Sequence, residues 1–329
     1  MAIDGIAKNQ HYVPQFILKN FSNGNKDQVY VFDKAGDKTF RSNVRNVASE
    51  NGFYNFQVDD EEHSLEPLLC DIEAKSALII NRIIESESLS HLTKEDKSIL
   101  SHFMAIQFVR TKDYREHYKD GAIKLLEALK VRGFTDDVLE YHEFNIPSDD
   151  DIKEFGLQAI LDAPRIAPFF YKKDWTIQKA PNEAKLYISD HPISMNNFYP
   201  ATGIRSNLGL AVEGIQLNFP ISPKLSIGMH CPTLLEKFKR EILNAKANLL
   251  LSPTANLNIE PIKVMDKLIS SFETGSPIAL TKDNVTHLNS LQVMNGNRFV
   301  YSSNAEFKLI KDMLKKNSVY RTGQRSIVQ

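Results

Sequence analysis

The spacing of apolar residues changes once near the start of the chain, and this change limits the class of fold. Before Ser64, short apolar runs alternate with turns: "QVYVFDK" at 28–34 predicts a strand, and "TFRS" at 39–42 predicts its partner in a hairpin. After Ser64 the apolar residues recur at helical spacing: Leu65, Leu68, Leu69, Ile72, Ile79, Ile80 and Ile83. A chain with both patterns must pack sheet against helix, so we predict an α+β fold with a small N-terminal β-hairpin region followed by central helices.

The next segments extend the helical part of the chain. "TKED" at 93–96 resembles a capping box, and an apolar stripe runs from there to Arg110. Residues 121–131 are expected to continue this helix after a break near Gly121. The acidic passage at 145–156 is the best candidate for a linker or helix start. We therefore divide the chain into 1–147 and 148–329, with one continuous domain as the alternative.

The second half returns to strands and then to helices. Four apolar segments with Pro and Gly between them predict a mixed or antiparallel sheet: 174–180, 185–189, 214–222 and 225–231. Three helices, one strand and a last basic helix are predicted after them: 233–246, 258–271, 281–295, 298–303 and 306–317. The C-terminal part is therefore expected to be helical around a single further strand.

Composition excludes several classes of protein. The chain has 329 residues and 42% apolar residues, enough to bury a large core. Cys70 and Cys231 lie far apart, which argues against a disulfide framework or a structural zinc site. The start resembles no signal peptide and no segment approaches a membrane span, so we expect a cytoplasmic protein without a membrane partner. Because the net charge is only −1, any contact with nucleic acid is expected to be made by local basic clusters, at 236–246 and 308–325.

The strongest local candidate for chemistry is "KLYISDHPISMNN" at 185–197, where an apolar strand ends in a carboxylate, a histidine and a proline. Asp190 there is suited to bind a divalent metal, to act as a general base or to orient His191. The alternative is structural, because an Asp before a turn often accepts hydrogen bonds from backbone N–H groups. The two readings have about equal weight, and the sequence does not decide between them.

A second candidate is Arg110 at the end of the predicted helix 93–110. Arg110 borders the apolar stripe, and a partly buried arginine needs a carboxylate or phosphate partner. Glu66 and Glu73 lie seven residues apart on one helix face and are suited to supply that carboxylate. Arg110 and His117 also loosely resemble the Arg-spacer-His motif of HEPN ribonucleases, whereas the alternative is a solvated charged face.

Motifs along nearly the whole chain resemble one bacterial family, the domain-of-unknown-function family 4238. They are "HYVPQFILKNF" at 11–21, "VYVFD" at 29–33, "NVASENGFY" at 46–54, "SLE" at 64–66, "QFVRT" at 107–111, "ISDHPI" at 188–193 and "FPISP" at 219–223. The resemblance implies a family with no settled activity, met in bacterial genomes near mobile-element and defence genes. It emphasises His11, Pro14, Asn51, Glu66, Gln107, Arg110, Asp190 and Asn289. His191 stands where the family usually has Asn, which leaves Asp190 as the stronger candidate.

Two functional hypotheses follow. In the first, the protein is a nucleic-acid-directed hydrolase, a nuclease with a role in defence. His11, Arg110 and Asp190 are catalytic, and Tyr12, Glu66, Gln107 and Asn289 bind or orient the substrate. Asp190 and Glu66 are the candidate ligands for a divalent metal.

In the second hypothesis the protein is a non-enzymatic binding or sensor module. The same polar residues then form a buried network, and a protein or small molecule binds in a cleft. The absence of a P-loop, a dinucleotide fingerprint, a nucleophile elbow and a zinc helix from the sequence favours this reading. The two hypotheses assign different roles to His11 and Tyr12, which either cap the first helix at Pro14 or form the wall of a pocket.

Overall fold

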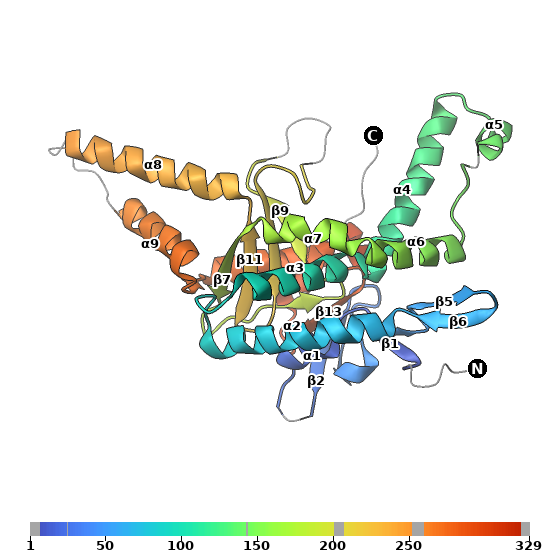
Figure 1. Ribbon diagram of the computed structural model, residues 1–329, viewed down its shortest axis with the longest axis horizontal. Coiled ribbons are helices and arrows are strands. Elements are labelled where there is room, and N and C mark those ends of the chain that lie inside the picture. The colour runs from blue at the N-terminus through green and yellow to red at the C-terminus, as the bar shows by residue number, and fades with distance from the viewer. Residues whose placement is uncertain (1–6, 25, 143, 201–206, 252–259, 324–329) are drawn as a thin grey trace.

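The computed structural model describes residues 7–24, 26–142, 144–200, 207–251 and 260–323, and it has two main sheets surrounded by helices (Figure 1). The five-stranded sheet has the strand order β12-β7-β11-β10-β9, and the four-stranded sheet has the order β3-β2-β13-β8. N-terminal strands, central helices, a mixed sheet in the second half and C-terminal helices all lie where the sequence predicts them. The predicted α+β class is confirmed.

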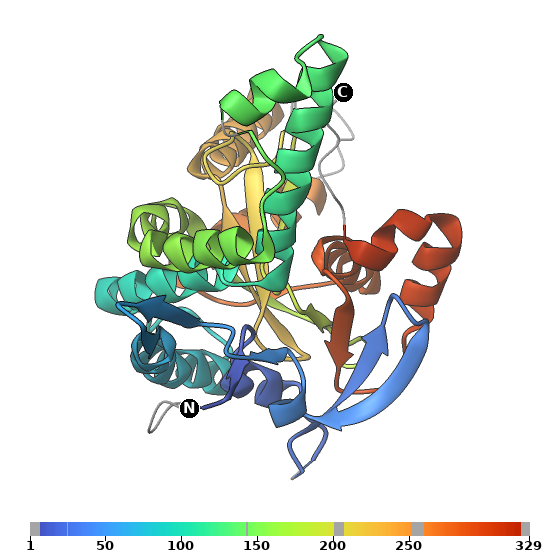
Figure 2. The same ribbon diagram turned by 90° about the vertical axis from the view of Figure 1, so that its right-hand side faces the viewer.

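The four-stranded sheet joins the two ends of the chain. The predicted hairpin pairs Gln28 with Asn43 and Asp33 with Lys38. Strand β13 adds to the other edge of β2, with Tyr301 opposite Val31, as Figure 2 shows where the red C-terminal strand lies beside the blue hairpin. The strands are β2 (Gln28–Asp33), β3 (Lys38–Asn43), β8 (Ile188–Ser189) and β13 (Phe299–Ser302). Segments about 270 residues apart therefore share one sheet.

Short elements at the N-terminus frame the first motif. Strand β1 (Asn9–His11) pairs with β4 (Ser49–Asn51), and α1 (Gln15–Asn20) begins directly after Pro14, as predicted. The helix has no side-chain cap, so His11 does not cap it. A further hairpin, β5 (Asn55–Val58) with β6 (Glu61–Ser64), leads into the first long helix.

The central helices start at the predicted caps. Thr93 and Asp96 form the capping box of α3, and Ser148 with Asp151 forms that of α6. The predicted break near Gly121 is wrong, because α4 is continuous there and the chain instead bends at Thr111, whose hydroxyl caps α4. The helices are α2 (Glu66–Ser86), α3 (Lys94–Val109), α4 (Lys112–Val131), α5 (Asp136–Tyr141), α6 (Asp149–Leu161) and α7 (Ala163–Tyr171). One glycine within a helix costs only about 1 kcal/mol, which a long helix tolerates.

The five-stranded sheet has one apolar face and one polar face. The apolar face packs on α3 and α7, where Phe103 contacts Phe219 with 6.2 Å between ring centroids. Helices α8 and α9 project together beyond the sheet at the left of Figure 1. The strands are β7 (Asp174–Lys179), β9 (Ser194–Asn197), β10 (Ile215–Pro220), β11 (Leu225–His230) and β12 (Ile278–Ala279). The helices of the last third are α8 (Pro232–Leu251), α9 (Glu260–Thr274), α10 (Lys282–Asn295) and α11 (Lys308–Lys316).

One core spans both halves of the chain. The largest cluster of buried apolar side chains includes Val13, Phe103, Leu217 and Tyr301, so residues on both sides of the 147/148 division contribute to it. The division thus falls at the cap of α6 rather than between separate cores. Within the described ranges, every helix is too short or too polar to cross a membrane.

Candidate functional site

The Asp190 side chain fastens one edge of the four-stranded sheet. It follows β8 directly, and its Oδ1 accepts a hydrogen bond from the Asn297 N–H at 2.7 Å. Its Oδ2 accepts from the N–H groups of Arg298 and Phe299, both at 2.8 Å. Only 2% of Asp190 is exposed. Burial raises its pKa, while the nearby Lys34 ammonium and these N–H groups act in the opposite direction.

Arg110 is the centre of a second polar network. Its side chain is fully buried, and its Nη1 donates to Glu73 Oε1 at 2.6 Å. Its Nε and Nη2 both donate to Gln107 Oε1, at 2.9 and 2.7 Å. The Gln107 amide in turn donates to the backbone carbonyl of Tyr12 at 2.9 Å. Glu73 is therefore the carboxylate partner that the sequence offered for Arg110, and the guanidinium lies away from solvent.

Glu66 and His11 lie beside this network without being hydrogen bonded to Arg110. Burial and the neighbouring Glu73 carboxylate raise the pKa of Glu66 to about 7. His11 Nε2 lies 3.3 Å from the Val44 carbonyl oxygen, and burial lowers the pKa of His11 despite the opposing effects of Val44 and Glu73. His11 and Glu66 are thus within electrostatic range of the same Arg110–Glu73 pair.

Asn289 lies elsewhere and has a backbone role. Its Oδ1 accepts from the Tyr187 N–H at 2.7 Å, and its Nδ2 donates to the Lys185 carbonyl at 2.9 Å. The two bonds satisfy a backbone N–H and a backbone carbonyl in the segment just before β8, the strand whose other edge pairs with β13. Asn289 therefore attaches α10 to the end of the segment that carries Asp190.

Asp190 and Tyr12 meet at a cavity of about 350 Å³, which we call the tyrosine pocket. Seven separate parts of the chain line it: Tyr12, Val31, Phe40, residues 46–50, Lys112, Asp190, and residues 297–301 through Asn297, Arg298, Phe299 and Tyr301. His11, Glu66, Gln107, Arg110 and Asn289 are not among its lining residues. Of the seven predicted site residues, the pocket brings together two.

The tyrosine pocket holds polar groups that sequence reasoning did not select. Lys112 pairs with Glu50 across the pocket, and Arg298 binds Asp33 through two hydrogen bonds at 2.9 and 2.7 Å. The hydroxyl proton of Tyr301 has no acceptor among the described residues, although this side chain is fully buried. The Ala48 N–H faces the hydroxyl oxygen and acts on it only as a donor. Burial raises the pKa of Tyr301 well above its ordinary value, so the phenol is neutral. The one signal in the sequence was "NGNRFVYSS", which follows the predicted helix 281–295.

A histidine pair lies next to this region. Thr111 Oγ1 is 2.7 Å from His191 Nδ1, and Asp113 Oδ2 is 3.1 Å from His117 Nδ1. His117 lies on α4, whereas Arg110 ends α3 and is buried. Arg110 and His117 therefore share no surface, and the structure offers no support for the HEPN-like spacing.

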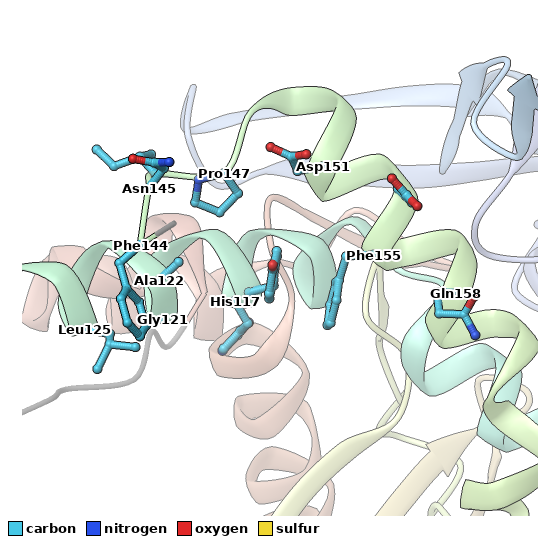
Figure 3. Close-up of a pocket in the computed structure, with 13 residues that line it drawn as sticks. His117, Gly121, Ala122, Leu125, Phe144, Asn145, Pro147, Asp151, Phe155 and Gln158 are labelled. Atoms are coloured by element: carbon cyan, nitrogen blue, oxygen red, sulfur yellow. The ribbon is translucent and has the colours of Figure 1, made fainter. Parts of the chain in front are cut away.

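A larger hollow, about 910 Å³, lies between α4 and α6 and is lined by none of the predicted site residues (Figure 3). His117 and Phe155 face it from the two helices, and the rings of Tyr118 and Phe155, which both line it, are stacked with their centroids 3.8 Å apart. It is an open groove with few polar groups that converge. Within the described parts of the chain, no group of three or more His, Cys, Asp or Glu residues is placed to hold a metal ion.

The chain was compared with known families, curated proteins and solved structures. A family model described as "Protein of unknown function (DUF4238)" matches residues 9–306. This range contains every segment on which the resemblance rests. Neither the curated proteins nor the solved structures contain a match.

The Asp190 geometry predicts the effect of Asp190→Asn. The amide keeps one acceptor oxygen and places an NH₂ group against a backbone N–H, so we expect a loss of about 2–4 kcal/mol in the free energy of unfolding, measured in urea. Asp312→Asn, on the exposed surface of α11, is the matched control and should change it by less than about 0.5 kcal/mol. Equal stability of the two variants would contradict a structural role for Asp190.

The raised pKa of Glu66 predicts a dependence of stability on pH. The folded-state pKa of about 7 lies above the unfolded value of about 4.5, so the free energy of unfolding falls as the pH rises from about 4.5 to about 7, where only the folded state keeps the proton, and Glu66 causes no further loss above that. Glu66→Gln removes this effect and should raise the free energy of unfolding by about 1–3 kcal/mol at pH 8, with no difference from wild type at pH 4.5. Urea unfolding at both pH values, with the exposed Glu61→Gln as control, measures it. A gain that is the same at both pH values would argue against the raised pKa.

Proposed function

The chain belongs to the DUF4238 family of proteins of unknown function, and from its own geometry we propose that it is a binding module whose tyrosine pocket holds a small polar ligand. The observation that carries this proposal is the Tyr301 hydroxyl, which is buried at the pocket without an acceptor among the described residues. A buried hydroxyl whose proton lacks an acceptor costs stability, so it is retained where a ligand supplies that acceptor.

The surrounding networks support binding rather than chemistry. Both carboxylate oxygens of Asp190 accept hydrogen bonds from backbone N–H groups, and the guanidinium of Arg110 donates to Glu73 and Gln107. Neither side chain has a free atom for a nucleophile or for a phosphoryl group. Both instead fix the pocket, because Asp190 holds residues 297–299 and Gln107 holds the Tyr12 carbonyl. This arrangement corresponds to a preorganised binding site.

The polar groups at the pocket indicate the character of the ligand. Tyr301 needs a hydrogen-bond acceptor, and Lys112 and Arg298 lie beside it, each paired with a carboxylate that a ligand acceptor can replace. About half of the Arg298 side chain is exposed, so it is reachable from solvent. The volume of about 350 Å³ lies at the lower end of the range for small-molecule sites.

Replacing Tyr301 by Phe tests the proposal without knowledge of the ligand. Because the hydroxyl proton has no acceptor among the residues that the structure describes, Tyr301→Phe should keep or raise the free energy of unfolding, by up to about 1 kcal/mol. Tyr187→Phe is the matched control, since the Tyr187 hydroxyl donates to the Glu306 carbonyl at 2.5 Å and its loss should cost about 1–2 kcal/mol.

The same pair of variants then serves in a thermal-shift screen of small carboxylates, phosphates and polar metabolites. A ligand of the tyrosine pocket should stabilise wild type and Tyr187→Phe but not Tyr301→Phe. If Tyr301→Phe is as destabilising as Tyr187→Phe, the hydroxyl has a structural partner and the proposal fails.

A nucleic-acid-directed hydrolase with a role in defence is the second candidate, and the Glu66 carboxylate is the observation that favours it. A pKa of about 7 suits general acid–base catalysis, and Glu73 and His11 lie nearby. In this reading His11 and Glu66 take part in the reaction, Glu66 also binds a metal, and Arg110 and Asp190 act by positioning. The exposed lysines of α11 would contact the nucleic acid, and Arg325 of the same basic cluster lies outside the described residues.

Incubation with single-stranded and double-stranded RNA and DNA, with Mg²⁺ or Mn²⁺, tests this second candidate. Cleavage that Glu66→Gln lowers at least tenfold, while Glu61→Gln leaves it unchanged, is the expected result for a nuclease. Intact nucleic acid under all these conditions removes the candidate. If Glu66→Gln still cleaves nucleic acid at the wild-type rate, the protein is a nuclease but Glu66 is not part of its active site.

A further inference from the structure

The second face of the five-stranded sheet is polar although helices cover it. Residues opposite one another in antiparallel strands share a face, and Asn218 on β10 lies opposite Gly228 on β11, which lies opposite Thr176 on β7. The side chains on this face include Thr176, Gln178, Asn196, Gln216, Asn218 and Ser226. Four of these six are buried. A sheet face that packs on helices is normally apolar, so this one needs a different explanation.

A cavity of about 310 Å³, which we call the amide pocket, lies between this face and helices α8, α9 and α10. Its floor is formed by the four amide side chains named above and by His230. Phe198, Phe238 and Phe272, with leucine side chains from the helices, form its walls. No Lys, Arg, Asp or Glu is among the described residues that line it. The pocket therefore combines an uncharged polar floor with apolar walls.

Three of the amides form a directed chain across the floor. Gln178 Nε2 donates to Asn218 Oδ1 at 3.4 Å, and Asn218 Nδ2 donates to Asn196 Oδ1 at 3.2 Å. The chain crosses β11 above Gly228, where a Cβ atom would lie 2.6 Å from Gln178 Nε2. Only glycine leaves room for this crossing.

The chain begins with an unused acceptor. Gln178 Oε1 is buried and has no hydrogen-bond partner among the described residues, and the same holds for Ser226 Oγ on the neighbouring strand. Only 8% of Gln178 is exposed. At the other end, Asn196 accepts through its Oδ1, and its side chain borders the cavity. The floor thus presents both a hydrogen-bond acceptor and donors, fixed by their neighbours.

His230 adds an uncharged imidazole to this floor. Its Nε2 lies 3.0 Å from Thr176 Oγ1, and its ring meets the Phe272 ring in an edge-on contact at 5.1 Å. Burial lowers the pKa of His230 to about 4, so the ring is neutral near pH 7. His287 on α10 is the other histidine of the lining, and no Lys, Arg, Asp or Glu among the described lining residues offers a permanent charge to a ligand.

We propose that the amide pocket binds an uncharged nucleobase, as the free base or as its nucleoside. Asn and Gln side chains read the donor and acceptor edges of bases, and aromatic rings stack on their faces. The absence of a cation on the described lining argues against a phosphate group, and so favours a base or nucleoside over a nucleotide. This site is separate from the tyrosine pocket, because no residue lines both.

Isothermal titration of the full chain with adenine, cytosine, uracil and the four ribonucleosides tests the proposal. We expect at least one base and its nucleoside to bind, and the corresponding monophosphate to bind at least tenfold more weakly. Gln216→Leu changes a half-buried floor residue, and Leu280→Trp fills the cavity from its wall. Each variant, checked for folding by circular dichroism, should weaken binding at least tenfold, whereas Gln15→Leu on the exposed side of α1 should leave it unchanged.

Several results would overturn the proposal: no binding of any base or nucleoside, binding that both folded variants retain, or equally tight binding of the monophosphate. Binding of a single-stranded oligonucleotide without binding of any base or nucleoside would overturn it as well. If one variant fails to fold, the other decides. Tyr301→Phe should leave nucleobase binding unchanged, so failure at the amide pocket and failure at the tyrosine pocket are separate outcomes.

Discussion

The Asp190 carboxylate holds together parts of the chain that are more than 100 residues apart, and the tyrosine pocket depends on it. Its two oxygens accept the N–H groups at the start of β13, the strand that joins the C-terminal part of the chain to the N-terminal hairpin. Tyr301 lies on that strand and lines the pocket. Arg298, the residue directly before the strand, binds Asp33 at the end of β2. A carboxylate that accepts from three backbone N–H groups stabilises their arrangement strongly, because charge-assisted hydrogen bonds are stronger than neutral ones.

Arg110 provides the corresponding constraint from the helical side. A fully buried guanidinium must have all its donors satisfied or it destabilises the fold by several kcal/mol. Glu73 and Gln107 supply the acceptors, and the remaining amide group of Gln107 then reaches the Tyr12 carbonyl. The position of Tyr12 at the pocket is therefore tied to the burial of a charge on another element. Two polar networks, one centred on Arg110 and one on Asp190, thus fix different lining residues of one cavity.

Local signals in the sequence predicted most elements, because caps and periodicity are local. Thr93 with Asp96 started α3, and the alternation at 28–34 marked β2. The sequence misplaced the bend to Gly121, since a single glycine has a smaller effect than the capping hydroxyl of Thr111. Strand β9 was missed because "SMNN" lacks apolar alternation, and only its pairing with β10 makes it a strand. Among the site residues, Asp190 and Tyr12 were found, but Tyr301 and Arg298 were not, because their role depends on the long-range pairing of β13 with β2.

The dependence on long-range packing also explains why the sequence did not predict a buried polar face on the five-stranded sheet. Strands β7 and β10 alternate polar and apolar residues in "DWTIQK" and "IQLNFP", and such alternation ordinarily predicts a face in contact with water. Here three helices cover that face, so the alternation that marks solvent exposure in most sheets instead produces a buried set of amides. Burial of so many hydrogen-bonding groups is costly when some lack partners, and Gln178 and Ser226 do lack them among the described residues. A fold optimised for stability alone would place valine or isoleucine at these positions, as it does on the opposite face, so the polar floor points to a requirement other than stability.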